Sequence, residues 1–66
     1  MNADEILEEL QNQIDARIKQ FNSFMDKASK AKSTEEKDRL ILIANEHEFG
    51  ANVLRSFQSD INEGNQ

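Results

Sequence analysis

Hydrophobic residues recur with a seven-residue period along the first half of the chain. One position of this repeat holds Leu7, Ile14, Phe21 and Ala28, and the other holds Leu10, Arg17, Phe24 and Ala31. Two such positions per heptad form a continuous apolar stripe along one side of an α-helix, and Ile18 and Met25 broaden it. The pattern therefore predicts a helix over residues 3–31.

The second half of the chain shows the same period. One position holds Leu40, His47, Leu54 and Ile61, the other holds Ile43, Gly50 and Phe57, and Ala44 and Ala51 lie beside them. Asn2 with Glu5, and Ser33 with Glu36, have the spacing of capping boxes at helix starts. We expect a turn at residues 32–33, a second helix over 34–62 and a frayed tail over 63–66 in which Gly64 caps the helix.

Two helices of similar length joined by a short turn predict an antiparallel helical hairpin, and hence an all-α fold with a single domain. Residues equally distant from the turn should lie level, which pairs Leu10 with Phe57, Ile14 with Leu54 and Phe24 with Ile43. The matching apolar positions of the two helices support this register.

The same register places Phe21 opposite His47 and Arg17 opposite Gly50. The side chain that Gly50 lacks leaves room for the stem of Arg17 or for one face of Phe21. The guanidinium group of Arg17 could then extend towards Glu46 or into water. We interpret these positions as packing features of the helix seam.

A second apolar face is predicted on the second helix. The run from Leu40 to Ala44 covers more than a full helical turn, so a single partner helix cannot bury all of it. Residues Leu42, Phe49 and Val53, with Ile41 next to them, form a stripe roughly 110° around the helix from the seam. We predict that this stripe is an interface, most simply in a two-fold homodimer that forms a four-helix bundle, while docking on another protein and a place at the rim of the hairpin core remain alternatives.

Catalytic and metal-binding patterns are lacking. The chain has no cysteine and one histidine, and the neighbouring side chains of Glu46, His47 and Glu48 point in three directions on a helix. Two copies of His47 could meet only across a dimer axis. We therefore expect no enzyme activity, no metal and no cofactor.

The net charge of −5, from 13 acidic and 8 basic residues, disfavours diffuse binding to nucleic acid or to anionic membranes. Residues 1–15 carry five acids and no base, whereas residues 16–32 carry five bases and one acid. With no signal-peptide pattern and no apolar run of membrane-spanning length, a cytoplasmic protein is expected.

These features favour a small non-enzymatic protein that regulates, inhibits or helps assemble a partner protein, as bacterial and phage accessory factors do. In layout alone the chain resembles the Rop-like plasmid copy-control proteins, helical-hairpin dimers that bind paired RNA hairpins. This resemblance implies RNA or DNA binding as an alternative, for which the candidate residues are Lys19, Lys27, Lys30, Gln13 and Gln20. A second alternative is an acidic nucleic-acid mimic that would use Asp4, Glu5, Glu8, Glu9, Asp60 and Glu63.

Overall fold

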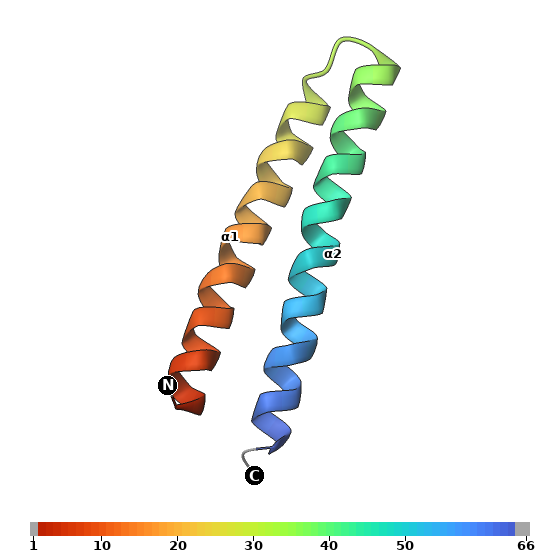
Figure 1. Cartoon of the computed structure of the whole chain (residues 1–66). Coiled ribbons are helices and arrows are strands. Elements are labelled where there is room, and N and C mark those ends of the chain that lie inside the picture. Colours follow the sequence, from red (N-terminus) through yellow and green to blue (C-terminus); the bar gives the residue numbers. More distant parts are fainter. Residues whose placement is uncertain (1, 65–66) are drawn as a thin grey trace.

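The computed structural model describes residues 2–64 and contains two long helices, α1 (Ala3–Ser29) and α2 (Thr34–Gly64). They run antiparallel side by side, so that the start of α1 and the end of α2 lie at the same end of the molecule (Figure 1). The molecule measures 49 × 14 × 13 Å. The predicted all-α helical hairpin is confirmed.

The helix ends follow from local hydrogen bonds. The side chain of Asn2 accepts a bond from the Glu5 amide at 2.9 Å, and the Ser33 hydroxyl accepts one from the Glu36 amide at 3.1 Å. Helix α1 ends two residues before the predicted Ala31, because the Lys30 and Ala31 amides bond to carbonyls only three residues back. Helix α2 includes Gly64 without a positive φ, so the predicted tail begins within the helix, and residues 65–66 lie outside the described part.

The core between the helices is narrow and consists mostly of alanine. Among the described residues, the buried apolar side chains are Ile14, Ala28, Ala44 and Ala51. Ile14 is the one large side chain in this set. Small side chains permit a close approach of two helix axes but remove little apolar area from water.

The seam of α2 is rotated by one residue from the predicted register. Ile43, Gly50 and Phe57 were expected to face α1, but the fully buried residues are the neighbouring Ala44 and Ala51, while Ile43, Gly50 and Gln58 are half-buried and Phe57 is exposed. Phe57, which was expected to lie in the seam opposite Leu10, has a side chain that is 56% exposed. Ala44 and Ala51 fill this side of α2, and the Gln58 side-chain amide donates a hydrogen bond across the seam to the Gln11 side-chain oxygen at 2.9 Å.

The hairpin exposes a large surface for its mass. Its accessible area is 4981 Å², whereas a compact monomer of the same 7.6 kDa mass is expected to expose about 4300 Å². The excess is about 700 Å² and follows from the elongated shape. This excess accessible area is similar to the roughly 800 Å² that each partner buries in a standard protein–protein interface.

Candidate interaction surface

Helix α2 carries a row of large apolar side chains that are open to solvent. The exposed fractions are 62% for Leu42, 71% for Phe49, 39% for Val53 and 56% for Phe57. We call these four residues the α2 apolar face. Ile41, which was predicted to accompany them, is half-buried.

The one-residue rotation of the seam also moves this face. Ala44, His47 and Ala51 now mark the side of α2 that meets α1. Helical geometry then places Leu42, Phe49 and Val53 roughly 150° from the seam, further around than the 110° expected from the sequence. The α2 apolar face consequently points away from α1.

Sequence reasoning missed Phe57 as a member of this face, because its heptad position had assigned it to the seam. Its spacing of four residues from Val53 was the signal that could have identified it. Four exposed charged residues share the same side of α2 by helical periodicity: Glu35 and Arg39 before the apolar residues, Glu46 among them and Asp60 after them.

A cluster of side chains crosses the seam at Gly50. The guanidinium group of Arg17 covers this residue, with its Cζ atom 3.3 Å from where a Cβ atom would lie. The register prediction that Arg17 lies opposite Gly50 agrees with this geometry. It is the charged head of Arg17, rather than its aliphatic stem, that occupies the space.

The other partners in the cluster differ from those expected. The Arg17 Nη1 atom is 3.2 Å from His47 Nδ1, whereas the sequence had suggested that it extends towards Glu46 or into water. The His47 ring stacks on Phe24 rather than on Phe21, with centroids 5.7 Å apart and 14° between the ring planes. Since an arginine can only donate, this contact requires an unprotonated Nδ1 on His47.

Neither this cluster nor the charged residues form a metal site. Within residues 2–64, no group of three His, Asp or Glu side chains is placed so that it could hold a metal ion. His47 is held by an arginine and an aromatic ring, and both contacts are explained by packing in the seam.

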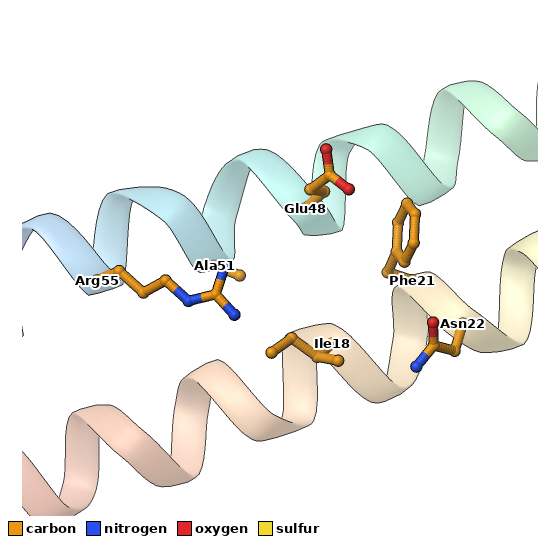
Figure 2. Close-up of a pocket in the computed structure, with 6 residues that line it drawn as sticks. All are labelled: Ile18, Phe21, Asn22, Glu48, Ala51 and Arg55. Atoms are coloured by element: carbon orange, nitrogen blue, oxygen red, sulfur yellow. The ribbon is translucent and has the colours of Figure 1, made fainter.

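A groove of about 230 Å³ opens on another side of the hairpin (Figure 2). It is lined by Ile18, Phe21, Asn22, Glu48, Ala51 and Arg55. Figure 2 shows Phe21 standing between the two helices and the Arg55 side chain reaching towards the gap between them. The groove is smaller than the 300–1000 Å³ of typical ligand pockets, and this favours a surface depression rather than a small-molecule site.

The residues proposed for nucleic-acid binding all lie on α1. Lys27 Nζ lies 4.8 Å from the centre of the Phe24 ring, and Lys30 pairs with Asp26 at 3.1 Å. The Gln13 amide bonds to Glu9 at 3.3 Å. Lys19 and Gln20 are exposed. The side chains of Lys27, Lys30 and Gln13 thus already contact other residues of α1.

No family model, curated protein or solved structure matches this chain. Within the described residues, neither helix is long and apolar enough to cross a membrane. The α2 apolar face is accordingly the feature from which a function can be argued.

Proposed function

We propose that this protein is a non-enzymatic protein-interaction module whose α2 apolar face is covered by another helical surface, in the first instance by a second copy of the chain. The observation that carries the proposal is the row of exposed Leu42, Phe49, Val53 and Phe57 on one helix. Contiguous apolar patches of this kind mark interaction sites in soluble proteins.

The energetics of a short chain support this proposal. Full burial of a Leu or Phe side chain contributes about 1.5–3 kcal/mol, and among residues 2–64 Ile14 is the one large apolar side chain that is fully buried, while the other large side chains of the seam are half-buried. Domains below roughly 70–80 residues need reinforcement beyond one core, and oligomerisation is one source of it. The excess surface of the hairpin is close to the roughly 800 Å² that each partner buries in a standard interface.

A homodimer through this face would bring the two α2 helices into contact with α1 of each copy on the outside, so the four helices would lie side by side rather than in the four-helix bundle expected from the sequence. The apolar residues that would form the contact belong to α2, whereas Gln13, Gln20 and Lys27 give a polar character to one side of α1. This arrangement leaves α1 accessible. We propose that the dimer binds, and thereby regulates, inhibits or helps assemble, a partner protein through such outward surfaces.

RNA or DNA binding is less well supported. Lys27 is placed over an aromatic ring and Lys30 has an acidic partner in its own helix, so neither is an uncommitted phosphate ligand. For the acidic-mimic alternative, the net charge of −5 is modest, and no described feature groups the acids into a built site.

The experiment that tests the proposal is affinity capture from native cell lysate with tagged wild-type protein and with Glu5→Lys, Lys19→Glu and Leu42→Gln variants, each with and without nuclease. A stoichiometric protein partner that resists nuclease and is lost with one of the surface variants would support a protein-interaction module. Recovery of RNA or DNA that nuclease and moderate salt remove would replace it with the nucleic-acid alternative. Met25→Gln is the matched control for Leu42→Gln, because Met25 is an exposed apolar residue of α1.

A further inference from the structure

Exposed charged residues flank the α2 apolar face, with Glu35 and Arg39 at the turn end and Asp60 at the other end. Arg39 lies before the face and Asp60 lies after it, both exposed and both on the same side of α2 by helical periodicity. We infer that two copies of the hairpin pair head to tail along α2, so that Arg39 of each copy meets Asp60 of the other. This inference rests on the proposed self-association and adds its orientation.

The charge distribution along the hairpin favours this orientation. The half that contains the two chain ends, residues 1–15 and 50–66, has seven acidic residues and one basic residue. The half at the turn, residues 16–49, has six acidic and seven basic residues, and five of these basic residues lie in residues 16–32, outside α2. The charge difference between the two halves therefore acts at long range across the hairpin and not at the α2 contact itself. Because like charges repel, a dimer that places the acidic half of one copy beside the turn half of the other is favoured over one that joins the two acidic halves.

The register of the pair follows from the positions of the two charged residues. Arg39 lies ten residues before Phe49, and Asp60 lies ten residues after Gly50. A two-fold axis between Phe49 and Gly50 therefore makes Arg39 level with the partner's Asp60.

The opposite orientation would oppose like charges at four points. In a parallel pair, each of these residues would face its own copy in the partner: Glu35, Arg39, Glu46 and Asp60. Like charges directly opposite one another destabilise such contacts. The head-to-tail arrangement removes all four of these oppositions and replaces those at Arg39 and Asp60 with two symmetry-related attractive pairs.

A charge-reversal cycle tests the orientation. The dissociation constant of the dimer is measured by sedimentation equilibrium for the wild type, Arg39→Glu, Asp60→Arg and the double variant. We expect each single variant to raise the dissociation constant by roughly three- to tenfold, since two symmetry-related exposed pairs become repulsive. The double variant should return to within about twofold of the wild type, because the pair is restored with its charges exchanged.

The matched controls change the same charge in the same half of the hairpin but away from the α2 apolar face. Lys37→Glu controls for Arg39→Glu, and Glu8→Arg controls for Asp60→Arg. Both controls should change the dissociation constant less than their counterparts. If a control raised the dissociation constant as much as its counterpart, the head-to-tail pairing would be overturned while self-association stayed intact. The same would follow if the two single substitutions raised the dissociation constant of the double variant by the product of their separate effects.

A second readout uses the lack of cysteine in the chain. Arg39→Cys and Asp60→Cys are prepared separately, mixed and oxidised gently. Head-to-tail pairing predicts a disulfide in the mixture between the two different variants, and little disulfide when either variant is oxidised alone. Cross-linking within each single variant would establish the parallel pair instead, and a wild type that stays monomeric would contradict the proposed self-association itself.

Discussion

The guanidinium group of Arg17 lies over the backbone of Gly50, with Nε and Nη1 each 3.4 Å from the position that a Cβ atom would occupy. A charged side chain thereby crosses the seam of the hairpin where α2 has no side chain of its own. The relationship explains why a glycine in the middle of a long helix is compatible with its packing, although glycine costs up to about 1 kcal/mol there relative to alanine.

Gly50→Ala should therefore raise the free energy of unfolding by about 0.5–1 kcal/mol, as measured by urea denaturation. The new methyl group meets only the far end of a flexible arginine side chain, which can move by a few tenths of an ångström. Gly64→Ala is the control, because nothing lies within 4 Å of its Cβ position. A loss of stability in Gly50→Ala would show that the arginine is held too rigidly to move.

The stacking of His47 on Phe24 should be measurable as a coupling energy. A double-mutant cycle with His47→Ala and Phe24→Leu is expected to give about 0.5–1.5 kcal/mol in urea denaturation. The control cycle replaces Phe24→Leu with Phe21→Leu, since Phe21 was the partner expected from the sequence alone. A larger coupling for Phe21 than for Phe24 would contradict the observed register.

Because alanine side chains fill the contact between α2 and α1, a larger side chain at one of these positions should destabilise the fold. Ala44 is fully buried, so Ala44→Leu should lower the free energy of unfolding by about 1–3 kcal/mol through overpacking. Ala16→Leu makes the same change at an exposed position of α1 and should alter stability by less than about 0.5 kcal/mol. Equal effects of the two substitutions in thermal unfolding would be evidence against a close alanine contact between the helices.

Much of the fold can be predicted from the sequence because its signals are local. The heptad pattern identifies two helices, and the caps at Asn2 and Ser33 are visible in their spacing to Glu5 and Glu36. A connection of a few residues between two long helices then leaves the antiparallel hairpin as the simplest arrangement.

The rotation of α2 could not be predicted in the same way. Ile43, Gly50 and Phe57 share one heptad position, and the neighbouring position holds Ala44, Ala51 and Gln58. Hydrophobicity alone favours the first set as the side of α2 that faces α1. Close approach of the two helices favours the second set, and how closely they approach depends on the side chains of both helices together.

The same distinction applies to the candidate interaction surface. Leu42, Phe49 and Val53 could be singled out because no hairpin seam can bury residues on several sides of one helix. Phe57 could not, since its exposure depends on the rotation. The contact of Arg17 with His47 could not be predicted either, because the spacing of residues along the sequence does not determine the rotamers of long side chains.

The most direct measurement of the proposed self-association is sedimentation equilibrium of the wild-type protein from low to high micromolar concentration, with Phe49→Gln and Met25→Gln run in parallel. We expect the wild type and Met25→Gln to approach twice the 7.6 kDa mass of the chain, and Phe49→Gln to shift towards the monomer. A folded wild type that keeps the monomer mass at every concentration would contradict the proposal that a second copy covers the α2 apolar face.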